Sequence, residues 1–187
     1  MLREGDATMS DTSVAIQSRR NLATIAIVLI PVGIAVNYVG KSLAQAVGLP
    51  LFLDTIGTML VAVLVGPWYA AGAGLATNIV YGLTIRPTAI PFGIVNAATG
   101  IVVGYLALRG WFRTPWRVAG VGIIVAIVNT LLAAPIAVLV FGGFTGSGTD
   151  AVTAFFLATG GNIGKAVLSS QAITSPADKV ISAFVAY

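Results

Sequence analysis

Residues 49–81 read LPLFLDTIGTMLVAVLVGPWYAAGAGLATNIVY. Two apolar segments meet at the Gly-Pro-Trp turn of residues 66–68, and a Gly-Pro pair between apolar runs predicts a helical hairpin. Polar side chains lie near the far end of both segments, with Asp54 in the first and Asn78 and Tyr81 in the second. If both segments cross a membrane, these groups return to the same side, which is the outline of a small pocket open to one face of the bilayer.

The composition of the chain is that of a membrane protein. Of its 187 residues, 57% are hydrophobic and 9% are charged, and the mean hydropathy is +0.97. A soluble domain carries about 25% charged residues, so this chain has too little polar surface to cover a soluble core of its size. The length allows a single domain. At about 20 residues for each span, we predict an all-α, polytopic membrane bundle of six transmembrane helices.

The order of apolar and polar runs predicts the organisation of the chain. We expect residues 1–20 to form a disordered cytoplasmic tail and residues 21–187 to form one transmembrane domain. Apolar runs predict spans at about 22–40, 49–65, 68–84, 88–108 and 118–141, followed by a flexible glycine-rich loop at 142–150.

The last part of the sequence allows two interpretations. Residues 151–172 form either helical pieces that cap the outer face or a re-entrant segment that lies against protein. A new helix is expected to begin at Ser175-Pro176, because proline favours the first position of a helix. Its apolar run stops at Tyr187, which favours a sixth span that is truncated.

Basic residues set the expected orientation. With the N-terminus inside, six arginines are cytoplasmic, three of them in the segment RGWFRTPWR at 109–117, and four basic residues are outside. An excess of Lys and Arg marks cytoplasmic loops, so we predict a cytoplasmic N-terminus. The net charge of +4 does not indicate a nucleic-acid partner, because the basic residues lie at segment ends rather than on one face.

Several kinds of chemistry are excluded by the residues present. The chain has no cysteine and no histidine, which removes disulfides, thiol catalysis and histidine-based metal sites or general bases. It has no glycine-rich phosphate loop with a following lysine. We therefore expect no enzymatic activity, no metal and no cofactor.

Polar groups inside the predicted spans are the candidates for function, because burying them in hydrocarbon is costly. Asp54 ranks first, as a ligand contact or a gate, and an ordinary acid at a helix start is an equally good interpretation. The asparagines, taken singly, suit hydrogen bonds between helices better than ligand contacts, and Asn129 is interpreted in that way. The predicted substrate-binding residues are Asn37, Tyr38, Asp54, Thr55, Thr58, Asn78, Tyr81, Phe92, Asn96, Asn162 and Gln171.

Four stretches of the chain resemble a known family. LDTIGT (53–58), GPWYAAGAGLATNIVYG (66–82), IPFGIVNAATGIVVGYLA (90–107) and PADKVISAFVAY (176–187) are similar to the S-components, the substrate-binding membrane subunits, of energy-coupling factor (ECF) vitamin transporters. The resemblance implies a six-helix protein of the prokaryotic plasma membrane with both termini cytoplasmic. It also implies that the chain binds one vitamin or related small molecule and associates with a transmembrane coupling subunit and two ATPase subunits.

In that family, the pocket is built by the loop between the first two helices and by the outer parts of helices four to six. By position this corresponds to residues 37–54, to Phe92 and Asn96, and to residues 160–178. Alanines four apart on the first helix, a common docking face in the family, are absent here, since Ala23 is followed by Ile27.

The leading hypothesis from the sequence is therefore the substrate-binding subunit of an ECF-type ABC importer. The alternative is a membrane-embedded sensor or input module that binds a small molecule without transporting it. A third possibility is a structural membrane subunit that binds no ligand.

Overall fold

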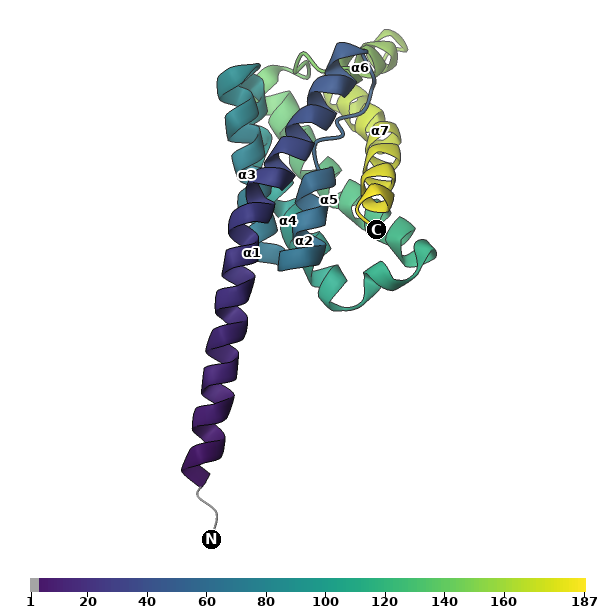
Figure 1. Cartoon of the computed structure of the whole chain (residues 1–187). Helices are drawn as coiled ribbons and strands as arrows, with labels where there is room; N and C mark the ends of the chain where they lie inside the picture. The colour runs from purple at the N-terminus through teal and green to yellow at the C-terminus, as the bar shows by residue number, and fades with distance from the viewer. Residues whose placement is uncertain (1–3) are drawn as a thin grey trace.

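The computed structural model describes the backbone of residues 4–187 and the side chains of residues 24–187. Throughout this part of the chain the regular structure is helical, as predicted from the sequence (Figure 1). The α-helices are α1 (Glu4–Ala46), α2 (Ile56–Val65), α3 (Pro67–Thr84), α4 (Gly93–Leu108), α5 (Pro115–Phe141), α6 (Thr149–Ala158) and α7 (Ile163–Val185), and two short 3-10 helices are η1 (Pro87–Phe92) and η2 (Trp111–Arg113).

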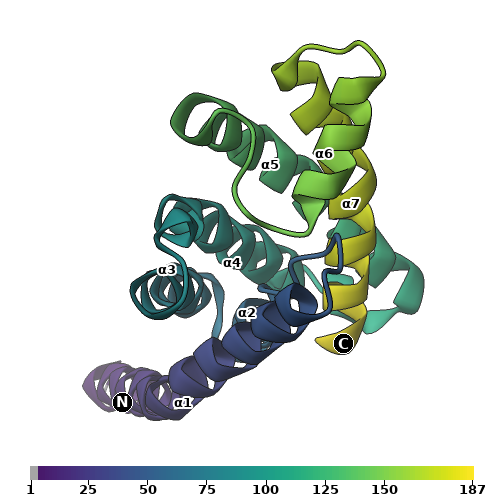
Figure 2. The same cartoon turned by 90° about the horizontal axis from the view of Figure 1, so that it is seen from above.

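The helices pack as two groups that face each other. Helices α1, α2, α3 and α4 contact one another on one side, and α5, α6 and α7 form the other side (Figure 2). The two groups meet where α4 packs on α5 and α2 packs on α7. The N-terminal part of α1 projects well beyond the rest of the bundle (Figure 1).

Three helical stretches are long and apolar enough to cross a membrane. They are Thr24–Ala46, Pro87–Leu108 and Pro115–Phe141, with mean hydropathies of 1.7, 1.7 and 2.6. Large apolar side chains on these stretches are exposed, for example Ile27 at 72% and Leu139 at 83%, as expected for helices whose outer face contacts lipid. The helices α2 and α6 are also apolar but have 10 residues each. These features indicate a membrane protein.

The predicted helix at 49–65 is wrong in its first third, because residues 49–55 are not helical and α2 begins only at Ile56. The residue before a proline is disfavoured in the helical region, and Leu49 precedes Pro50. Leu53 has a φ of 48°, which an α-helix does not allow. Asp54 therefore precedes the helix and does not lie one turn inside it.

The predicted helix start at Ser175-Pro176 is also wrong. Pro176 lies inside α7, which begins at Ile163 because the side chain of Asn162 accepts a hydrogen bond from the backbone N–H of Lys165 at 2.9 Å. Such N-caps define helix starts. Residues 151–172 thus belong to α6 and to the first half of α7, with a break at Gly160 and Gly161.

At the other end of the chain, α1 begins at Glu4. Residues 4–20, for which the sequence predicted a disordered tail, are drawn as helix, and residues 1–3 of that predicted tail lie outside the described residues.

Close contact between helices depends on glycines that face a neighbouring backbone. A Cβ atom on Gly57 of α2 would lie 2.0 Å from the carbonyl oxygen of Gly33 on α1, and one on Gly100 of α4 would lie 2.6 Å from the backbone of Ala70 on α3. Small residues at helix crossings are typical of membrane proteins, where they allow backbones to approach closely.

We expect the substitution Gly57→Ala to destabilise the protein by at least about 1–3 kcal/mol, because the new methyl group must push α1 and α2 apart. The matched control is Gly72→Ala in α3, where a Cβ would meet nothing within 4 Å. Thermal unfolding in detergent measures both. Equal melting temperatures for the two variants would contradict the described crossing of α1 and α2.

Candidate functional site

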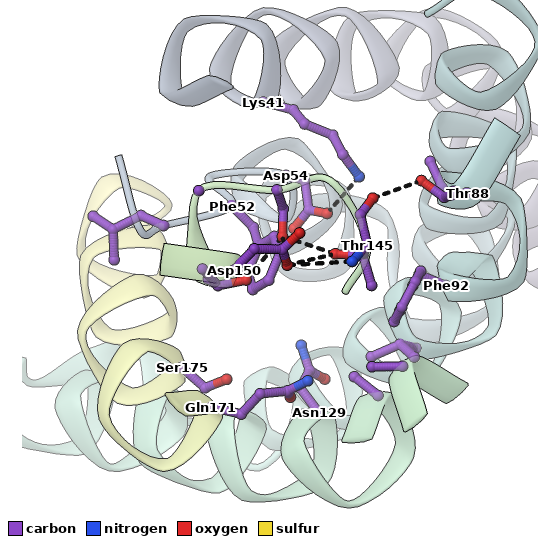
Figure 3. A pocket seen from close by; sticks show the side chains of 18 of the residues that line it. Lys41, Phe52, Asp54, Thr88, Phe92, Asn129, Thr145, Asp150, Gln171 and Ser175 are labelled. Carbon is purple, nitrogen blue, oxygen red and sulfur yellow. Dashed lines mark hydrogen bonds and ion pairs between the residues drawn. The ribbon is translucent and has the colours of Figure 1, made fainter. Parts of the chain in front are cut away.

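A cavity lies between the two helix groups. Its accessible volume is about 90 Å³, several times the roughly 10–15 Å³ that one water molecule needs, and it is partly open to solvent. Figure 3 shows its interior, with Asp54 and Thr145 on one side and Gln171 and Asn129 on the opposite side. The lining comes from α1, the non-helical segment 51–55, α3, η1, α4, α5, the loop 143–148, α6 and α7.

Six of the eleven predicted site residues line this cavity. They are Asp54, Thr55, Tyr81, Phe92, Asn96 and Gln171. The other five, which are not part of its lining, are Asn37, Tyr38, Thr58, Asn78 and Asn162. The fold thus brings together residues that are more than a hundred positions apart in the sequence, and their contact with a ligand remains a prediction.

Asn37 connects three helices beneath the cavity. Its Nδ2 donates to Thr58 Oγ1 at 2.8 Å and to Thr77 Oγ1 at 3.1 Å, and its Oδ1 accepts from the backbone N–H of Gly57 at 2.7 Å. The side chain is completely buried. Since its donors and its acceptor are all engaged within the protein, Asn37 holds α1, α2 and α3 together and has no free group for a ligand.

Thr58 and Asn96 extend this network to the cavity wall. Thr58 Oγ1 donates to Asn96 Oδ1 at 2.8 Å, and Asn96 Nδ2 donates to the backbone carbonyl of Asp54 at 2.9 Å. Asn96 therefore joins α4 to the segment 51–55 and fixes the backbone position of Asp54.

Asp54 lies between two lysines that come from opposite ends of the chain. Its Oδ2 is 3.0 Å from Lys41 Nζ on α1, and its Oδ1 is 3.4 Å from Lys179 Nζ on α7. Lys179 also forms an ion pair with Asp178, and Lys41 donates to Asn78 Oδ1 at 3.1 Å. Two cations and two carboxylates make this cluster neutral, which is the condition under which charges are tolerated away from water.

The helix α7 also binds the backbone of the segment 51–55. Asp178 Oδ1 accepts from the backbone N–H groups of Phe52 at 3.2 Å and Leu53 at 2.8 Å, and Lys179 Nζ donates to Thr55 Oγ1 at 3.2 Å. Buried backbone N–H groups outside a helix need partners of this kind. Asp178 thus supports a non-helical wall of the cavity.

Tyr38 and Asn162 each make contacts within the protein that account for a polar side chain at their positions. The ring of Tyr38 packs edge-on against Tyr81 at a centroid distance of 5.3 Å, and its hydroxyl bonds with Thr84 Oγ1 at 3.1 Å. Asn162 is the N-cap of α7 and does not line the cavity. The contact of Asn162 with a substrate therefore stays a prediction.

The sequence analysis missed Lys41, Lys179 and Ser175, and it assigned Asn129 to helix packing alone. A signal for three of them is present in the sequence. Polar residues recur every four positions in two helices, as Asn37-Lys41-Gln45 in α1 and as Gln171-Ser175-Lys179 in α7. Positions four apart lie on one face of a helix, and all of these residues except Asn37 line the cavity.

Fold and cavity together define a class of protein. In its described part the chain is all-helical, it has the composition of a membrane protein, and it contains a partly open cavity lined by both apolar and polar side chains. No protein-family model, curated protein or solved structure matches the chain. The resemblance to ECF S-components therefore stays a prediction based on the four stretches described above.

We expect Asp54→Asn to destabilise the protein by about 3 kcal/mol, because it leaves the half-buried Lys41 without a carboxylate and the buried Lys179 with Asp178 alone. The double variant Asp54→Asn with Lys41→Met restores the charge balance and should lose less stability than the sum of the two single variants. Thermal or denaturant unfolding in detergent provides the comparison. A stable single variant, or strictly additive losses, would disprove the coupling within this cluster.

Proposed function

We propose that the protein is the substrate-binding subunit of an ECF-type importer, and that it captures a vitamin or related small molecule from outside the cell. The observation that carries this proposal is the cavity, lined by apolar and polar side chains, at one end of an apolar helical bundle. Each of the four stretches that resemble the family contributes lining residues to this cavity, among them Asp54, Tyr81, Asn96 and Lys179. If the resemblance is correct, these four stretches should contribute to one common binding site.

In this proposal the chain crosses the membrane six times, through α1, the short α2 with its preceding segment, α3, α4, α5 and α7. The cavity lies at the end where α1, α3 and α5 finish, near Lys41 and the loop 143–148. The arginine-rich connection at 109–117 lies at the opposite end of the bundle (Figure 1). The positive-inside rule then places the arginines and the N-terminus in the cytoplasm and opens the cavity to the outside.

The chain would bind and release its substrate without catalysing a reaction. Energy would come from two partner ATPases through a transmembrane coupling subunit, since the chain has no phosphate-binding loop of its own. The segment 51–55 is held to α1 and α7 by side-chain contacts. In this proposal, a movement of these helices driven by the partner subunits would also move this wall of the cavity and release the substrate.

The test is mass spectrometry of small molecules and proteins that remain bound after gentle purification in detergent from the native host. We expect one retained small molecule per chain, together with a coupling subunit and ATPases. A retained molecule without these partners would favour the sensor, and the absence of both would refute the proposal.

A pair of variants on α5 links the retained molecule to the cavity. Ala133 lines the cavity and is 9% exposed, whereas Leu131 is 66% exposed on the same helix. Ala133→Phe should fill the cavity and abolish retention, while Leu131→Phe should leave retention unchanged. Retention that survives Ala133→Phe in a folded protein would place the ligand elsewhere.

A further inference from the structure

One wall of the cavity holds buried polar side chains that are not hydrogen-bonded within the described part of the chain. Gln171 and Ser175 on α7 are 7% and 3% exposed, and neither side chain bonds with another described residue. Asn129 on α5 is 5% exposed and uses only its oxygen, which accepts from Thr99 Oγ1 at 2.9 Å. Figure 3 shows these three side chains along the wall opposite Asp54.

The free polar atoms of these side chains border the cavity and are not sealed within packed protein, so a molecule inside the cavity is their remaining hydrogen-bond partner. Each of these side chains is more than nine-tenths buried and lines the cavity. Their free groups are those of neutral amides and a hydroxyl. Gln171 offers a donor and an acceptor side by side, and Asn129 offers the donors of its Nδ2 group.

Apart from the half-buried Arg86, which forms no ion pair with the described residues, the charged groups around the cavity are engaged within the protein. Lys41, Lys179 and Asp54 are bound to one another or to Asp178, and Asp150 accepts from the backbone N–H groups of residues 145 and 146. With the half-buried Arg86, the charged lining residues and Asp178 comprise three cations and three carboxylates. A charged ligand would find no net counter-charge to replace its hydration.

Aromatic side chains supply the remaining contacts. Phe92 lines the cavity and stacks on Phe141 at a centroid distance of 5.9 Å with the rings 16° apart, which holds its ring in a defined orientation. Phe52 and Tyr81 line the cavity as well. Aromatic walls favour flat ring systems as partners.

We propose that the cavity binds an uncharged planar heterocycle that carries a cyclic amide edge, an N–H beside a C=O, as in pyrimidinediones and pteridinediones. Gln171 pairs with the N–H and C=O of this edge, Asn129 Nδ2 donates to a second ring acceptor, and the aromatic side chains contact the ring faces. This inference rests on the proposed binding function and adds the chemical class of the substrate.

The test uses three probes of one ring system with the full chain purified in detergent. Lumazine carries the amide edge, 1,3-dimethyllumazine lacks its N–H donors, and lumazine-6-carboxylate adds a charge. By equilibrium dialysis we expect lumazine to bind at least about tenfold more tightly than either relative, because each of them leaves buried groups unpaired. Equal or tighter binding of the dimethyl or carboxylate probe, or no binding of lumazine, would overturn the proposed class.

Two variants of α7 test whether Gln171 contacts the amide edge of the ligand. Gln171→Met keeps the length of the side chain and removes its amide, so lumazine binding should weaken at least about tenfold while dimethyllumazine binding changes little. Leu168→Met, at a residue 48% exposed on the same helix, is the control and should bind as the parent does. Unchanged lumazine binding by folded Gln171→Met would refute the pairing.

The outcome for the ligand class is separate from the outcome for the proposed function. A retained native molecule that carries a carboxylate or phosphate would overturn the class and still support substrate capture. The absence of any retained molecule, together with no binding of the probes, would count against both.

Discussion

The arrangement of the cavity depends on one carboxylate held between two lysines. Asp54 joins Lys41 near the end of α1 to Lys179 near the end of α7, and these two helices belong to different halves of the bundle. Around Asp54 the chain is not helical, so the wall formed by residues 51–55 keeps its place through side-chain contacts. Without that carboxylate, Lys41 would lose its ion-pair partner and the buried Lys179 would keep Asp178 alone, which is unfavourable.

The neutrality of this cluster explains the division of the cavity into two kinds of wall. On the side of Asp54, charges and hydrogen-bonding groups are engaged within the protein. On the side of Gln171 and Asn129, amide groups remain free. The first side gives the cavity its shape and the second provides its recognition chemistry. Asn37, one of the predicted ligand contacts, belongs to the scaffold because Thr58, Thr77 and Gly57 use its whole hydrogen-bonding capacity.

Hydropathy was sufficient to predict the all-helical class and the positions of α3 and α5, because long apolar runs between turn residues leave few alternatives. It failed at residues 49–55 and at Pro176. The first is an apolar run that leaves the helix because of Pro50 and because its backbone binds Asp178, and no local pattern shows a partner 125 positions away. The helix start predicted at Ser175-Pro176 is wrong because proline was taken as a start signal, although the cap at Asn162 fixes the start of α7. Polar residues at four-residue spacing were the missed signal for Lys41 and Ser175.

The most direct test of the central claim is an experimental structure of the protein purified without added ligand and then with lumazine. The account predicts density for a flat molecule in the cavity, in contact with Gln171 and Asn129 on one side and separated from an intact pair of Lys41 and Asp54 on the other. A cavity filled by a lipid chain, or a structure in which Asp54 contacts neither lysine, would contradict it.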